Sequence, residues 1–203
     1  MRIPTWCSLL AASTFAGALA CGEVSFPVIP AEEFTATLTG ANEVPAVTTT
    51  TTGTAVFGVI NDTILTFRVD VAGMDSTTAS HIHEGAAGVV GPVIVTLFTG
   101  PTACLSATGT PINVASPRCR TGFTGPLNQA QVKYSALTQL PAGYGVRAPT
   151  PITPADTLRA RSDTMRARFD SLLVLMRTGG VYVNAHNLVN PGGHVRGPIG
   201  PRP

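Results

Sequence analysis

Four histidines are the residues whose type and spacing could do chemistry. His81 and His83 are two residues apart, so on a β-strand they point to one face while the residue between them points to the other. The same alternation along 181–186 places His186 on the polar face of a second strand. His194 lies on the polar face of a third. All four imidazoles are therefore predicted to lie away from the apolar core.

Three or more converging imidazoles form a donor set that suits copper or zinc. Neighbouring strands lie about 4.8 Å apart, so the histidines can meet if their strands are adjacent. Neutral imidazole is the form that binds, so metal affinity should fall as the pH drops through about 6.5. The alternative is that these histidines only hydrogen-bond the backbone at strand ends and turns. The sequence leaves both interpretations open.

The elements that must position the histidines are predicted to be mostly strands. Short segments that alternate or are rich in β-branched residues occur at 34–39, 53–60, 63–71, 79–83, 93–98, 181–186 and 195–199. Turn signals made of Gly, Pro and Asn separate them. Several short strands bounded in this way predict an all-β fold, an antiparallel β-sandwich.

One helix is expected near 154–178. Thr153 is a suitable N-cap, and Pro154 fits the first helical position. Apolar residues, including Phe169 and Met176, then recur at helical spacing, and glycines follow at 179 and 180. We expect this apolar stripe to pack on the sandwich.

The composition is that of a folded domain without bulk nucleic-acid binding. The chain has 203 residues, of which 44% are hydrophobic and 12% charged, with a net charge of +2. Residues 21–100 carry eight acids and one Arg, net −7, whereas 101–203 carry ten Arg, one Lys and three Asp, net +8. We expect the two halves to neutralise each other within one fold; the alternative is a basic face for a partner.

The N-terminal residues carry the pattern of an export signal. Residues 1–20 contain one early Arg and an apolar run too short to span a membrane, so they are predicted to be a signal peptide. Small residues precede Cys21 as in a bacterial lipobox, which predicts acylation of Cys21 and anchoring to the outer membrane, on its periplasmic or cell-surface side. Cleavage near Ala20 with plain secretion, or a retained anchor, are the alternatives. Residues 21–33 would be the tether.

Two further cysteines remain for the exported domain. Cys104 and Cys119 form an even pair in an oxidising compartment, which predicts a disulfide. Closing a loop of this length would contribute about 3 kcal/mol. A thiolate metal site is the alternative, but the sequence has no C-x-x-C spacing to support it.

Several stretches together resemble the CHRD (chordin-type) domain. The stretches that carry the resemblance are 36–45, 53–55, 81–93 and 180–197. The resemblance covers 34–199, is weakest over an insertion at 101–178, and leaves 200–203 as a tail. It implies a β-sandwich module without assigned catalysis. The chain departs from the pattern at His194, where the family usually has Glu.

The layout has a weaker resemblance to copper-zinc superoxide dismutase. That family also has a His-x-His-Glu strand, a later strand that ends in His and a Gly-Gly stretch near its end. The sandwich would then have a Greek-key topology, Ig-like or superoxide-dismutase-like. No histidine lies between His83 and His186, so the bridging and zinc-binding residues of that family have no counterparts.

The sequence therefore predicts an exported, lipid-anchored CHRD protein that is a non-enzymatic binding or structural module of the cell envelope. Its expected partners are the membrane, through the lipid, and a protein of the envelope, with no nucleic acid. The alternative is a periplasmic copper- or zinc-binding protein. No Gly-x-Ser-x-Gly, His-Glu-x-x-His or P-loop motif is present, so no enzyme activity is predicted.

Overall fold

The computed structural model describes residues 30–100, 116–133 and 154–203. The predicted signal peptide at 1–20, most of the predicted tether, Cys21 and Cys104 lie outside these residues. Their roles therefore stay predictions, as does the pairing of Cys104 with Cys119.

Nine antiparallel strands make up one sheet. The strands are β1 (Glu32–Thr39), β2 (Thr52–Ile60), β3 (Ile64–Met74), β4 (Thr77–Glu84), β5 (Val93–Thr99), β6 (Phe123–Lys133), β7 (Val181–Asn187), β8 (Val195–Pro198) and β9 (Gly200–Pro201). Their order across the sheet is β5-β4-β7-β8-β1-β2-β3-β6, with β9 paired to β1. Two 3-10 turns, η1 (Gly40–Asn42) and η2 (Pro117–Cys119), and one helix, α1 (Pro154–Thr178), complete the described residues.

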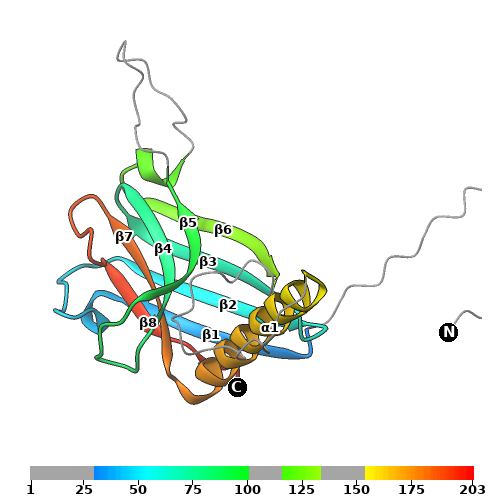
Figure 1. Ribbon diagram of the computed structural model, residues 1–203. Helices are drawn as coiled ribbons and strands as arrows, with labels where there is room; N and C mark the ends of the chain where they lie inside the picture. Colours follow the sequence, from blue (N-terminus) through cyan, green and yellow to red (C-terminus); the bar gives the residue numbers. More distant parts are fainter. Residues whose placement is uncertain (1–29, 101–115, 134–153) are drawn as a thin grey trace, which may run out of the picture.

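The sheet curves until its two ends face each other. Figure 1 shows β4 and β5 in front of β2 and β3. The amide of Asn128 in β6 donates to the carbonyl of Leu97 in β5 at 2.6 Å, so the first and last strands of the sheet approach each other. The prediction of an all-β antiparallel fold with one helix is confirmed. The apolar faces of the curved sheet enclose the core as the two layers of a sandwich would.

Alternation along the strands builds this core. In β1, β2 and β3 the apolar side chains fall at every second residue and are buried on the inner face. Phe34, Phe57 and Phe67 lie opposite one another across these three strands and are all buried. Such cross-strand aromatic pairs stabilise a sheet beyond the area they bury.

Helix α1 packs on the open side of the curved sheet. Its limits agree with the predicted 154–178, and it ends just before Gly179, whose φ of +70° is in the left-handed region that favours glycine. Phe169, Leu172 and Met176 are fully buried in the same cluster as the strand residues. Within the described residues, no helix has the length and apolarity needed to cross a membrane.

Two strands were not predicted, β6 and the two-residue β9, which lies in the predicted tail 200–203. β6 lies at the edge of the sheet and pairs with β3, with register shifts near Asp70 and Val71. It contains Gly125 and Pro126 and is largely polar, so it lacks the alternation of a half-buried strand. Proline is tolerated at an edge because the missing N–H faces no partner strand. Part of the predicted insertion at 101–178 is therefore built into the sheet.

Ion pairs join the two oppositely charged halves of the chain. Arg177 contacts Glu32 through two hydrogen bonds of 2.8 and 2.6 Å, and Arg202 contacts Glu33 at 2.8 Å. Exposed pairs of this kind contribute about 0–1 kcal/mol each. They agree with the expected neutralisation within one fold. The Arg202 pair and the pairing of β9 with β1 also join β1 to the C-terminal residues 200–202, which the sequence suggested were a tail.

Candidate functional site

The sheet order makes the two histidine strands neighbours. β4 pairs with β7, with His81 opposite Asn184 and His83 opposite Tyr182. His186 is two residues further along β7, diagonal to His81. Because Ile82 points into the core, the histidines of β4 lie on the other face, beside the ring of His186. This is the convergence that the alternation predicted.

Local irregularities in β4 help to aim these side chains. The pairing of β4 with β5 shifts register on both sides of the dipeptide His81-Ile82. Bulges of this kind re-aim side chains and are common next to functional sites. A side-chain bond also joins β4 to the backbone of β7 beside the histidines: the hydroxyl of Ser80 donates to the carbonyl of Asn184 at 2.7 Å.

One ring nitrogen from each of the three histidines lies within 4.8 Å of the other two. The closest pair is Nδ1 of His81 and Nε2 of His186, at 3.0 Å. An ion bound tetrahedrally at about 2.0–2.1 Å from each nitrogen would hold the nitrogens about 3.3 Å apart. A pair of nitrogens at the 4.8 Å limit would therefore have to move about 1.5 Å closer to bind the same ion. Among the described residues this is the one group of ligating side chains with metal-site spacing.

Backbone carbonyls fix which nitrogen of each ring carries the proton. Nδ1 of His83 lies 2.9 Å from the carbonyl oxygen of Gly91, and Nδ1 of His186 lies 3.0 Å from that of Pro191. A carbonyl can only accept, so both Nδ1 atoms are protonated in the neutral rings and both Nε2 atoms carry lone pairs. This is the outer-shell bonding that orients metal-binding histidines.

The lone pair on His83 Nε2 has no partner. This atom is buried and forms no hydrogen bond, whereas His186 Nε2 accepts from Nδ1 of His81 in the ion-free protein. A buried acceptor left unpaired costs about 1–3 kcal/mol. A bound ion would satisfy His83 Nε2, and it would move the His81 proton from Nδ1 to Nε2.

Burial keeps the cluster uncharged. It lowers the pKa of His81 to about 4, helped by the nearby His186 and His83, and it also lowers the pKa of both these neighbours. The bonds to Gly91 and Pro191 oppose the shift in part. The lone pairs thus remain available below pH 6.5, so the expected loss of metal affinity on acidification moves to lower pH than the sequence suggested.

The His83 ring stacks on Tyr182, and Arg196 packs against the same tyrosine. The imidazole lies parallel to the Tyr182 ring, with centroids 4.9 Å apart and 10° between planes. The guanidinium of Arg196 lies on the same tyrosine, 3.2 Å from the ring centroid. Arg196 is held by the carbonyls of Ala86 and Val89, so its position is set by the loop between β4 and β5. Its positive charge lowers the pKa of His83 and would weaken the binding of a cation.

Two loops cover this polar face of the sheet. Loop 85–92 supplies the carbonyl for His83, and loop 188–193 supplies the carbonyl for His186. As a result every residue of β7 is buried on both faces, and His81 is the most exposed member of the cluster. Gly91 is required in its loop, because a Cβ there would overlap the carbonyl oxygen of Glu84.

His194 lies apart from the cluster. Its Nε2 is 3.1 Å from the hydroxyls of Thr49 and Thr51, and its Nδ1 is 2.9 Å from the side-chain amide of Asn190. Both ring nitrogens therefore have partners. Of the four histidines proposed as ligands, the structure brings together His81, His83 and His186, and His194 ties the threonine-rich segment to loop 188–193.

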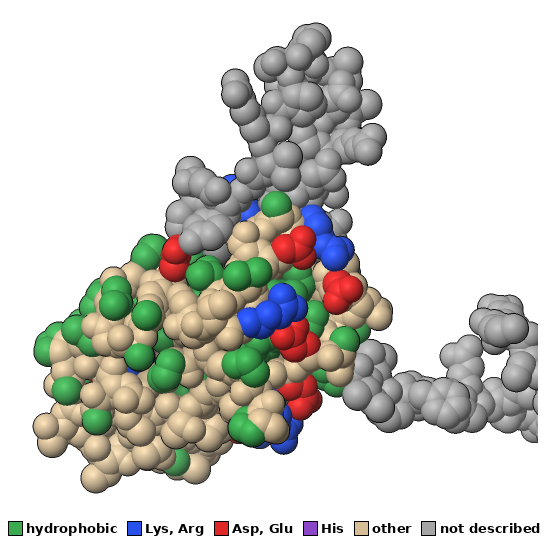
Figure 2. Space-filling model, turned by 90° about the horizontal axis from the view of Figure 1, so that it is seen from below, with side chains coloured by type: hydrophobic (Ala, Val, Ile, Leu, Met, Phe, Trp, Pro, Cys, Tyr) green, Lys and Arg blue, Asp and Glu red, His purple; other side chains and the backbone are tan. Residues whose placement is uncertain are grey.

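The loop segments at the cluster's end of the molecule carry no charged side chain. Segments 44–51, 85–92 and 188–193 contain no Asp, Glu, Lys or Arg. The exposed large apolar side chains found on them are Val44, Val89, Val90, Leu188 and Val189. In Figure 2 most of the visible charged side chains lie on the right, away from the end that these loops occupy on the left of Figure 1. An ion in the cluster would therefore be held by neutral donors.

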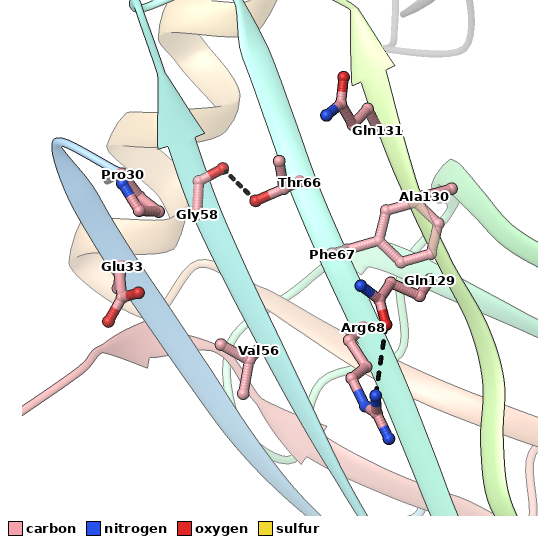
Figure 3. Close-up of a pocket in the computed structure, with 10 residues that line it drawn as sticks. All are labelled: Pro30, Glu33, Val56, Gly58, Thr66, Phe67, Arg68, Gln129, Ala130 and Gln131. Carbon is pink, nitrogen blue, oxygen red and sulfur yellow. Dashed lines mark hydrogen bonds between the residues drawn. The ribbon is translucent and has the colours of Figure 1, made fainter. Parts of the chain in front are cut away.

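A hollow of about 570 Å³ lies elsewhere, on the outer face of β2, β3 and β6. Figure 3 shows two hydrogen bonds among the residues that line it: Thr66 donates to the Gly58 carbonyl at 3.0 Å, and Arg68 donates to Gln129 at 3.3 Å. Arg68 also pairs with Asp70 at 2.6 Å. The residues that line the hollow include no group of ligating side chains with metal-site spacing.

Comparison with known families agrees with this architecture. The family model of the CHRD domain matches residues 34–199. The chain belongs to the CHRD family. This confirms the resemblance drawn from the motifs, and the match begins and ends where the motifs predicted. None of the curated proteins and none of the solved structures with which the chain was compared matches it.

Two residues beside the histidine cluster were not singled out from the sequence. Asn184 and Tyr182 share the polar face of β7 with His186, and both are 2% exposed. Alternation placed them on this face, but a polar face on a strand normally meets solvent. Their burial results from the two covering loops, which no local pattern in β7 indicates.

Proposed function

We propose that this CHRD protein is an exported, lipid-anchored module of the cell envelope that holds one zinc or copper ion at His81, His83 and His186. The observation that carries the metal assignment is the buried, unpartnered Nε2 of His83 inside a cluster of three ring nitrogens. Membership of the CHRD family supports a binding or structural module. Export and the lipid anchor rest on the sequence around Cys21.

The cluster is better suited to an ion than to water. The three nitrogens lie within 4.8 Å of one another, and His83 Nε2 is closed to solvent. A water needs room for a probe of its own size and two to four polar partners. The closest two nitrogens, Nδ1 of His81 and Nε2 of His186, are 3.0 Å apart, which is near the spacing of two ligands on one ion and too short for a water to lie between them. Neutral imidazoles with fixed tautomers are ready to accept it.

Metal titration of the chain, purified without an affinity tag, tests this proposal. Zinc or copper should bind at one equivalent per chain, measured by calorimetry and by metal analysis after dialysis. Binding should be lost in His83→Ala and in His186→Ala. His194→Ala is the matched control, because it removes a histidine of the same burial whose nitrogens already have partners, and it should still bind one ion. A stoichiometry far below one in the unmodified chain would overturn the proposal.

The anchor is tested separately. Mass spectrometry of the protein from its native host should show a diacylglycerol-type increase on Cys21, and Cys21→Ser should release the protein from membranes. A mature mass equal to that of the bare polypeptide would contradict the anchor while leaving the metal assignment in place.

We further propose that the module catalyses no reaction. The chain lacks the motifs of nucleophilic and zinc-dependent hydrolases, and the ligands lie on paired strands covered by loops. An ion in this position would link β4 to β7 and strengthen the sheet. The expected result of metal loading is therefore a higher unfolding temperature.

A further inference from the structure

Asn184 lies at the centre of the buried polar face. It is directly opposite His81 on β4 and opposite Arg196 on β8, and it is 2% exposed. Its backbone carbonyl is occupied by the Ser80 hydroxyl. Its side-chain amide lies within hydrogen-bonding reach of the His83 ring. The amide is thus held beside the metal cluster by strands on both sides.

The oxygen of this amide has no partner. Asn184 Oδ1 is buried and forms no hydrogen bond, as is also true of Nε2 of the neighbouring His83. Both atoms are acceptors, because the proton of His83 is on the nitrogen that donates to Gly91. Two acceptors cannot satisfy each other, and each left unpaired in the interior costs about 1–3 kcal/mol. A cation that contacts both removes the two penalties at once.

We propose that Asn184 Oδ1 is the fourth ligand of the ion held by the three histidines, and that it closes the coordination sphere. This inference rests on the proposed metal function. Three imidazoles and one oxygen give the four ligands that a tetrahedral zinc ion takes. A catalytic zinc keeps one position for water or substrate, whereas a structural zinc has four protein ligands. Asn184 therefore makes the ion a structural one that ties β4 to β7.

Cobalt(II) in place of zinc provides the test, because its visible absorption reports the coordination number. The unmodified chain should bind one cobalt with the intense bands of a four-coordinate site, and added azide should leave the spectrum unchanged. Asn184→Ala should still bind cobalt, but azide should now shift the bands. Zinc affinity in this variant should fall by at least the about 10- to 100-fold that loss of an outer-shell partner costs. Asn184→Asp restores an oxygen donor and should bind zinc at least as tightly as the unmodified chain.

Asn187→Ala is the matched control. Asn187 is also a buried asparagine of β7, but its Oδ1 already accepts the N–H of Asn190 at 2.7 Å. This variant should keep the closed spectrum. If azide shifts the spectrum of the unmodified chain, or if Asn184→Ala binds zinc as tightly as the unmodified chain, the fourth ligand is not Asn184 and only this inference fails. If the unmodified chain binds no cobalt or zinc, or if His83→Ala binds them equally well, the proposed function fails.

Discussion

Replacing Glu43 with glutamine should stabilise the protein at pH 8 and leave its stability almost unchanged at pH 4.5. Glu43 follows η1 and packs against Gly193 with 8% of its surface exposed. Its Oε1 is buried without a partner, and among the described residues it forms no ion pair. Burial raises the pKa of this carboxyl to about 7, although the charge of Arg196 acts in the opposite direction.

The size of the effect follows from the two pKa values. The folded protein holds the proton of Glu43 up to about pH 7, whereas the unfolded chain releases it near 4.5. Between these values the folded state binds more protons than the unfolded state, so the free energy of unfolding falls as the pH rises. The full difference of 2.5 pKa units corresponds to about 3 kcal/mol. Glutamine cannot ionise, so the variant should gain up to about 3 kcal/mol over the unmodified protein above pH 7.

Urea unfolding of both proteins at pH 4.5, 6 and 8 measures this difference. Glu33→Gln is the control, because Glu33 is half-exposed and paired with Arg202 at 2.8 Å. At pH 8 the control should be neutral or slightly less stable than the unmodified protein. A Glu43→Gln variant whose stability difference is the same at all three pH values would refute the reasoning, because the effect would not then come from ionisation.

Two further predictions concern the cluster and the core. In the metal-free protein the pKa of His81 is lowered to about 4, so between pH 4 and 6.5 the unfolded chain binds more protons than the folded protein. The free energy of unfolding should therefore fall as the pH drops from 6.5 towards 4. Urea midpoints measured across this range should fall less in His81→Gln than in the unmodified protein. Phe169→Ala removes a fully buried ring of α1 and should cost about 3–5 kcal/mol in urea unfolding, whereas Val174→Ala on the exposed side of the helix should change stability by less than about 0.5 kcal/mol.

The elements that could be predicted from the sequence are those whose own pattern is decisive. Helix α1 has a proline at its first position and glycines beyond its end, and its limits were predicted correctly. The strands with a regular apolar alternation were also found, and their predicted ends lie within three residues of those observed. β6 was missed because an edge strand that contains Gly125 and Pro126 has neither alternation nor an apolar run. Its position depends on pairing with β3, which lies outside the local sequence.

The same distinction applies to the site. Alternation correctly placed the histidines on the faces opposite the apolar residues, but it could not say which strands are neighbours. β4 and β7 are separated by about a hundred residues and pair only in the folded sheet. The pattern within β7 also does not show that loops 85–92 and 188–193 cover this face. Because they do, Asn184 is buried and its side-chain oxygen has no hydrogen bond. A single sequence shows the residues that can act as ligands, but it does not show which strands bring them together or which loops cover them.

The two interpretations of the histidines turn out to describe different atoms of the same rings. In His83 and His186 the Nδ1 atom bonds a backbone carbonyl, as expected of a structural histidine. That bond leaves the opposite nitrogen of each ring with a lone pair, and both lone pairs point into one cluster with His81. His194 shows the contrast, because both of its nitrogens have partners. His83 Nε2, by contrast, is buried without a hydrogen bond, and this is the reason to look for an ion there.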